Sequence, residues 1–162
     1  MTSTPHALPA HRSSHPALAI LWAGLLCGAM DITAAFVVYG SFGLQPIRIL
    51  KGIAAGLLGP SAFQGGDGIA ALGLACHFTV ALLAAAAFAA VSRYWRFLVE
   101  HFLISGVLYG IFVYFFMQFV VIPLSAAHRS PFSLKFTIIG VIIHIFCVGL
   151  PIAAVTRRFS AR

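Results

Sequence analysis

Acidic residues are almost absent from this chain. Only 3 of the 162 residues are Asp or Glu, against 10 Lys and Arg, and charged residues make up 8% of the chain. The sequence contains no paired carboxylates, no Ser-His-Asp arrangement and no phosphate-binding loop, which disfavours an enzyme. The net charge of +7 is spread over tails and short loops. Without any nucleic-acid-binding motif, this charge fits contact with anionic lipid headgroups better than contact with DNA or RNA.

Cysteine is scarce as well. The three cysteines, Cys27, Cys76 and Cys147, all fall within apolar stretches, and their number is odd. A secreted disulfide framework usually has an even number of cysteines, so we expect none here. A free cysteine in an apolar stretch often behaves as a small buried hydrophobic residue.

Long apolar runs make up most of the sequence. Hydrophobic residues form 61% of the chain, whereas ordinary soluble domains are about half apolar. A helix needs about 20 apolar residues to cross a ~30 Å hydrocarbon core. We therefore predict one all-α membrane domain over residues 17–157, a four-transmembrane-helix bundle between a flexible tail (1–16) and a basic tail (158–162). The predicted spans are about 17–40, 69–91, 97–122 and 134–155.

The segment between the first two spans predicts a shorter helix. Pro46 is suited to start a helix, and Gly59 with Pro60 is suited to end it. The helix over residues 47–58 is too short to span, and Arg48 and Lys51 share one face of it. We interpret it as an amphipathic interfacial helix whose cations contact lipid headgroups. A re-entrant half-helix is the alternative, because the segment is rich in glycine and alanine.

The distribution of basic residues gives an orientation. With the N-terminus inside, six basic residues lie inside and four lie outside. The inner set is Arg12, Arg93, Arg96, Arg157, Arg158 and Arg162, and the outer set is Arg48, Lys51, Arg129 and Lys135. Cytoplasmic loops carry an excess of Lys and Arg, which favours a multi-pass protein with both termini in the cytoplasm.

Each predicted span carries one polar or ionisable residue at a similar depth. The four are Asp31, His77, Gln118 and His144. His77 lies nine residues after Gly68 and His144 nine residues after Lys135, on spans that run in the same direction, which is roughly 14 Å below the surface at ~1.5 Å per residue. Such residues usually face the interior of the bundle, so we predict a buried polar cluster in which Asp31 bonds a histidine.

Small residues flank these positions at helical spacing. On the first span Asp31 is surrounded by Gly24, Cys27, Gly28, Ala34 and Ala35. On the second span Gly73 and Ala81 lie on either side of His77, and Gly106 with Gly110 forms a GxxxG pattern in the third span. Small residues let helix backbones approach closely in membranes. These faces therefore predict helix contacts, within one protomer or between the copies of a homo-oligomer.

Three hypotheses compete for the cluster. The preferred one is structural, because lone polar residues often join helices in membranes. The second is proton or cation handling through Asp31, His77 and His144. The third is a redox or metal site. His77, His144, Cys27 and Cys147 are candidate metal ligands, and the two histidines are candidate axial ligands of a haem. No tight ligand motif supports the third hypothesis, so no cofactor is favoured.

Three sequence features carry a family resemblance. They are Leu-Gly-Leu-Ala-Cys-His at residues 72–77, Val-Ile-Pro-Leu-Ser at 121–125, and Ile-Ile-His at 142–144. With these features in this order along the sequence, the chain resembles small bacterial inner-membrane proteins, distantly of the YagU-like type. The resemblance covers most of residues 17–157 and implies a four-helix inner-membrane fold. It brings no established chemistry, so it assigns no functional residue.

Overall fold

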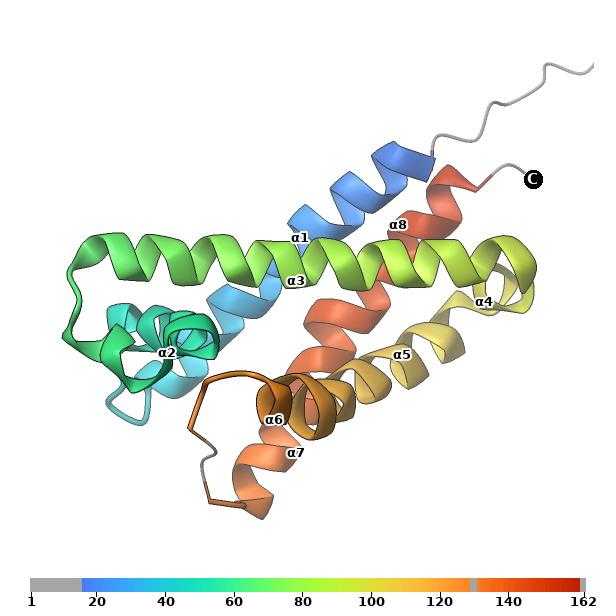
Figure 1. The fold of residues 1–162 in the computed structure, drawn as a ribbon. Coiled ribbons are helices and arrows are strands. Elements are labelled where there is room, and N and C mark those ends of the chain that lie inside the picture. Colours follow the sequence, from blue (N-terminus) through green and yellow to red (C-terminus); the bar gives the residue numbers. More distant parts are fainter. Residues whose placement is uncertain (1–15, 129–130, 161–162) are drawn as a thin grey trace, which may run out of the picture.

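Four long helical segments account for most of the protein (Figure 1). The computed structural model describes residues 16–128 and 131–160. The first two segments are α1 (Pro16–Gly40) and α3 (Asp67–Tyr94). The third consists of α5 (Phe102–Phe116), η2 (Met117–Val121) and α6 (Ile122–Leu124), and the fourth of α7 (Leu134–Ile143), η3 (His144–Gly149) and α8 (Leu150–Phe159). All four are long and apolar enough to cross a membrane. The protein is a multi-pass, all-α membrane protein, as the sequence predicts.

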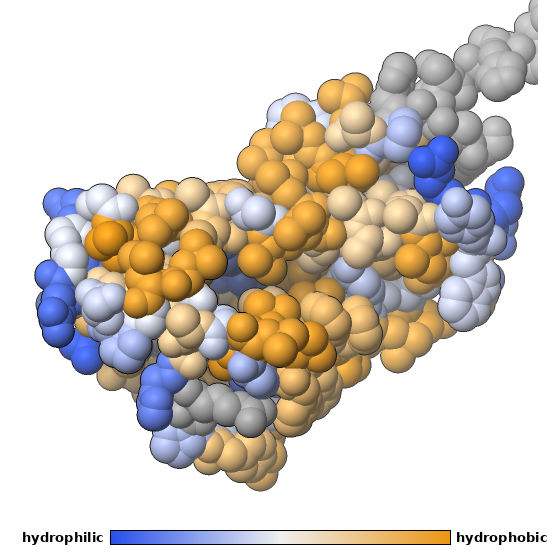
Figure 2. All heavy atoms as spheres, in the orientation of Figure 1, coloured by the Kyte–Doolittle hydropathy of each residue, from blue (hydrophilic) through white to orange (hydrophobic). Residues whose placement is uncertain are grey.

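The outer surface of the bundle is apolar. Large side chains such as Leu83, Leu108 and Phe146 are 64%, 59% and 60% exposed. In Figure 2 apolar residues cover most of the visible face, and hydrophilic residues gather toward its ends. A helix satisfies its own backbone hydrogen bonds, so it can present such a surface to lipid.

Small residues fill the interior of the bundle. Ala23, Cys27, Ala85 and Ala153 are fully buried, and Phe88 is the large aromatic residue at the centre. Lipid is as apolar as these side chains, so helices associate in a membrane through close packing rather than through the hydrophobic effect. Small side chains allow that packing, and α1 lies against both α3 and α8.

The GxxxG pattern of α5 packs inside the protomer. A methyl group added at Gly110 would lie 2.7 Å from the Cα of Ile145, and one at Gly106 would lie 2.9 Å from the Cα of Leu150. Gly149, on η3, approaches the backbone of both glycines. The sequence allows this glycine face to pack within one protomer or between copies of the chain. In the structure it packs the third segment against the fourth within the protomer.

The predicted short helix is α2 (Pro46–Leu58), which is followed by the 3₁₀ helix η1 (Gly59–Gln64). Pro46 occupies the first turn, where its missing N–H costs nothing. Gly59 ends the helix with φ +67°, a left-handed conformation that favours glycine. The buried Ala54 and Ala55 pack α2 against the beginning of α3, where Gly73 admits the backbone of Leu50. In Figure 1 α3 lies across the view and α2 is seen almost along its axis.

The start of the third span differs from the prediction. Residues Phe97–Glu100 form a separate turn, α4, and the spanning segment begins at Phe102. His101 has φ −108° and ψ 49°, which interrupts the helix. Arg96 and Glu100 form an exposed ion pair of 3.5 Å. The break keeps these polar residues out of the apolar span, where charge is costly.

Two spans widen into π-helix just before a proline. η2 precedes Pro123, and η3 precedes Pro151. A proline lacks an N–H and clashes with the carbonyl four residues earlier, and a π-helical turn relieves that clash. The helix predicted to stop at Pro123 therefore continues to Leu124.

The two ends of the bundle differ in their elements. The first turn of α1 and the last turn of α8 lie at one end, and α2 lies at the other (Figure 1). Of the predicted N-terminal tail (residues 1–16), Pro16 begins α1, and residues 1–15 lie outside the described residues, as do Arg129 and Arg162. Arg157 and Arg158, which the prediction places around the start of the C-terminal tail, belong to the last turn of α8.

Candidate functional site

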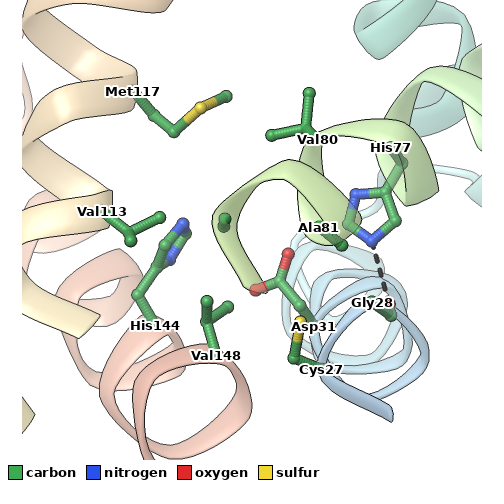
Figure 3. A pocket seen from close by; sticks show the side chains of 11 residues that line it. Cys27, Gly28, Asp31, His77, Val80, Ala81, Val113, Met117, His144 and Val148 are labelled. Carbon is green, nitrogen blue, oxygen red and sulfur yellow. Dashed lines mark hydrogen bonds between the residues drawn. The ribbon is translucent and has the colours of Figure 1, made fainter. Parts of the chain in front are cut away.

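A cavity of about 70 Å³ lies where the four spanning segments meet. α1 contributes Cys27, Gly28 and Asp31, and α3 contributes His77. The fourth segment contributes His144, and the third contributes only the apolar Val113 and Met117. Figure 3 shows the carboxylate of Asp31 between the two imidazoles. On one face of the molecule a recessed hydrophilic patch interrupts the apolar surface (Figure 2).

Asp31 has no protein partner within the described residues. Its side chain is half-buried and lines the cavity. The described chain gives it neither a hydrogen bond nor an ion pair, and Arg96–Glu100 is the one ion pair found there. A carboxylate inside a membrane domain normally pairs with another group, so this arrangement needs an explanation.

His77 joins two helices. Its Nε2 lies 2.9 Å from the carbonyl oxygen of Gly28, which bonds α3 to α1 (Figure 3). The ring also meets Phe78 edge-on at a centroid distance of 5.6 Å. The absence of a side chain at Gly28 leaves room for Phe78, because a methyl group there would lie 2.8 Å from its ring.

His144 is held by its own helix. Its Nδ1 lies 2.9 Å from the carbonyl oxygen of Gly140, one turn earlier. The ring of Tyr114 packs edge-on against the imidazole at 5.3 Å between centroids. His144 is the first residue of η3, and π-helical turns occur frequently at functional sites.

The predicted cluster is therefore only partly assembled. Asp31, His77 and His144 line one cavity, but Gln118 is not among its lining residues and lies half-buried on η2. The expected carboxylate–imidazole hydrogen bond is absent from the described residues, because each histidine bonds a backbone carbonyl instead. A carbonyl on the packing face lies closer to each ring than the carboxylate does.

No metal site is formed by these side chains. Within residues 16–128 and 131–160, no group of three His, Cys, Asp or Glu residues is close enough to hold a metal ion. The thiol of Cys27 instead donates to the carbonyl of Gly24 at 3.4 Å. Cys147 is half-buried and does not line the cavity.

The two basic residues of α2 lie away from the cavity. Arg48 is exposed, and its guanidinium lies 5.7 Å from the centre of the Phe63 ring. Lys51, one turn later, is half-buried. Both residues therefore lie at the end of the bundle that holds η1 and the start of α7.

Sequence reasoning missed one polar contact beside the cavity. The hydroxyl of Tyr109 donates to the carbonyl of Ala84 at 2.7 Å, which joins α5 to α3. Its ring packs edge-on against Phe88 at 4.9 Å between centroids. A tyrosine next to Gly110 of the GxxxG pattern was the signal that could have revealed it, since the hydroxyl of a buried tyrosine usually finds a partner.

Comparisons with models of known families, with curated proteins and with solved structures find no match. No relative therefore supplies an activity, a ligand or a partner for this chain.

Proposed function

We propose that this membrane protein handles positive charge, a proton or a small cation, at the cavity lined by Asp31. The observation that carries the proposal is the position of Asp31 between four spanning segments without a hydrogen bond or an ion pair within the described residues. Ionisable residues inside membrane domains commonly mark ion or proton pathways.

The structural hypothesis accounts for only part of the cluster. His77 connects α3 to α1 through Gly28 and so contributes to packing. Asp31 makes no comparable contact in the described chain. A residue retained only to join helices would be expected to bond a neighbouring helix, so the carboxylate supports a role in binding rather than in packing.

The haem and metal hypothesis has less support. The two histidines that would serve as axial ligands each use one ring nitrogen on a backbone carbonyl. Small residues also bring the helices into close contact around them. A macrocycle would need a much larger space than about 70 Å³.

The location of the protein is part of the proposal. We place it in a bacterial inner membrane with both termini in the cytoplasm, in a family distantly similar to the YagU-like proteins. Four described basic residues, Arg93, Arg96, Arg157 and Arg158, lie at the end that holds the termini of the bundle, against Arg48, Lys51 and Lys135 at the other. The excess of positive charge on the cytoplasmic side supports this orientation. In it α2 lies along the outer interface, where Arg48 and Lys51 reach lipid headgroups.

The test compares Asp31→Asn with Asp67→Asn in liposomes that contain the purified protein. Asp67 is exposed at the start of α3, so its variant is a control for the loss of one acid. Fluxes of protons, sodium, potassium and methylammonium are measured against empty liposomes. We expect an Asp31-dependent flux of at least one of them and near wild-type behaviour of Asp67→Asn.

Thermal unfolding in detergent accompanies the flux measurement. Asparagine has nearly the size of aspartate, so Asp31→Asn should fold. A folded Asp31→Asn variant that carries every cation at the wild-type rate would refute the proposal. A wild-type protein that carries none of the four above the empty-liposome rate would refute it too.

A further inference from the structure

The hydrogen bonds of the two histidines determine which of their nitrogens carries a proton. Nε2 of His77 and Nδ1 of His144 each lie 2.9 Å from a backbone carbonyl oxygen. A carbonyl oxygen only accepts hydrogen bonds, so each of these nitrogens must donate. In a neutral imidazole the other nitrogen is then an acceptor. With both rings neutral, Nδ1 of His77 and Nε2 of His144 are therefore left with free lone pairs.

The polar groups of the cavity are consequently all acceptors. The carboxylate of Asp31 accepts, and so do the two free ring nitrogens. The thiol of Cys27 already donates to Gly24 and offers no hydrogen to a ligand. Figure 3 shows the second ring nitrogen of His77 on the cavity side of its ring. An anion or a carbonyl compound would find no side-chain donor here, so a suitable ligand must bring both N–H or O–H donors and positive charge.

A bare metal ion does not suit this arrangement. Metal ligands must converge within about 2.0–2.6 Å of one point, and no three candidate ligands in the described chain do so. An ammonium group directs several N–H donors outward and reaches acceptors about 2.7–2.9 Å away in different directions. The cavity of about 70 Å³ holds more than a single water-sized group. Its apolar walls, Val80, Val113 and Met117, suit a methyl substituent.

We infer that the Asp31 cavity binds an ammonium-type cation, either ammonium itself or a small primary amine. The inference rests on the proposed handling of positive charge at this site and specifies its ligand. The carboxylate of Asp31 balances the charge, and the free nitrogens of His77 and His144 accept N–H hydrogen bonds.

The experiment uses two probes of equal charge on the whole protein in detergent. Methylammonium has three N–H donors, whereas tetramethylammonium has none. Binding of each, and of sodium, is measured by isothermal titration calorimetry at constant ionic strength. We expect methylammonium to bind and tetramethylammonium and sodium to bind at least about tenfold more weakly, since each lost charge-assisted hydrogen bond weakens binding by roughly tenfold or more.

Matched variants locate the site. Asp31→Asn should weaken methylammonium binding by roughly tenfold to a hundredfold, and His144→Phe by roughly threefold to tenfold. Their controls are Asp67→Asn and His101→Phe. His101 is exposed and stacks on Phe97 at 4.5 Å, away from the cavity. Both controls should bind methylammonium as the wild type does.

The outcomes separate the inference from the proposed function. Equal affinity for methylammonium and tetramethylammonium, or equal weakening by Asp31→Asn and Asp67→Asn, would overturn the inference. If sodium or protons then show an Asp31-dependent flux, the proposed function survives with a different ligand. If no cation shows one, both fail. The comparison of the two probes needs only the wild-type chain, so it decides the question even if His144→Phe does not fold.

Discussion

The Nε2 atom of His77 lies 2.9 Å from the carbonyl oxygen of Gly28, three residues before Asp31 on α1. This bond fixes α3 against α1 beside the carboxylate. It also orients the second ring nitrogen of His77 toward the cavity. His77 thus contributes both to packing and to the acceptor character of the site.

Replacing His77 by phenylalanine should destabilise the protein modestly. The ring is kept and the bond to Gly28 is lost, and interhelical hydrogen bonds in membranes contribute about 0.6 kcal/mol on average and up to about 1.7 kcal/mol. Thermal unfolding in detergent measures the change. His101→Phe is the control, because its ring is exposed. Equal stability of the two variants would show that the bond contributes nothing to packing.

Glycine at position 73 should be required for docking of α2. A methyl group there would lie 2.8 Å from the carbonyl carbon of Leu50 and 3.3 Å from the amide nitrogen of Ala54. Since backbone cannot move as freely as a side chain, Gly73→Ala should cost about 1–3 kcal/mol of unfolding free energy.

The matched control for that change is Gly68→Ala on the same helix. Nothing lies within 4 Å of a methyl group at this position, and alanine favours helix over glycine by up to about 1 kcal/mol. Gly68→Ala should therefore leave stability unchanged or raise it. The pair is compared by thermal unfolding and by proteolysis of residues 59–66. A Gly73→Ala variant as stable as Gly68→Ala would contradict the close approach of α2 and α3.

The fold could be predicted from the sequence because each span is apolar over nearly its whole length. Length and hydropathy suffice for that inference, and Pro46 with Gly59 predicted the short helix. The break at His101 could not be predicted in the same way. Phe97, Leu98 and Val99 are as apolar as the span that follows, and only the path of the folded chain decides where the helix restarts. The π-helical turns likewise depend on how the backbone adapts to Pro123 and Pro151.

The site could be predicted only in part. Counting residues along each span suggested a common depth for Asp31, His77 and His144. Hydropathy and spacing do not reveal hydrogen-bond partners, because backbone carbonyls compete with side chains for each imidazole. Gly28 and Gly140 expose such carbonyls next to the rings, and this competition left Asp31 unpaired in the described chain.

The contact of Gly110 on α5 with the backbone of η3 lies within one protomer, so we expect it to stabilise the fold of the protomer and not to hold two copies together. A methyl group at Gly110 would lie 2.7 Å from the Cα of Ile145. Gly110→Ala should therefore lower the unfolding free energy by about 1–3 kcal/mol without changing the oligomeric state. Light scattering after size-exclusion chromatography and thermal unfolding measure the two properties. Gly40→Ala is the control, because nothing lies within 4 Å of a methyl group there.

A change of oligomeric state in Gly110→Ala at unchanged stability would contradict this assignment. It would place the glycine face between copies of the chain. Loss of stability in both variants would point to a general effect of replacing glycine, which the open surroundings of Gly40 do not predict.

Residues at the two ends of the bundle report the orientation of the protein in the membrane. Ser61 is exposed on η1, at the end of the bundle that holds α2, and Tyr94 is 93% exposed at the end of α3, at the opposite end. If the termini are cytoplasmic, a membrane-impermeant maleimide should label Ser61→Cys in intact cells and Tyr94→Cys only after permeabilisation. The native Cys27, Cys76 and Cys147 lie within spanning segments, so the unmodified chain provides the background.

The excess of basic residues at the end that holds Tyr94 is the physical reason for that expectation, since Lys and Arg are retained on the cytoplasmic side during insertion. Labelling of Tyr94→Cys but not Ser61→Cys in intact cells would invert the orientation. Labelling of both would contradict the assignment of these residues to opposite sides, and with it the depth at which Asp31 lies between them. Only the expected pattern places α2, with Arg48 and Lys51, at the outer interface.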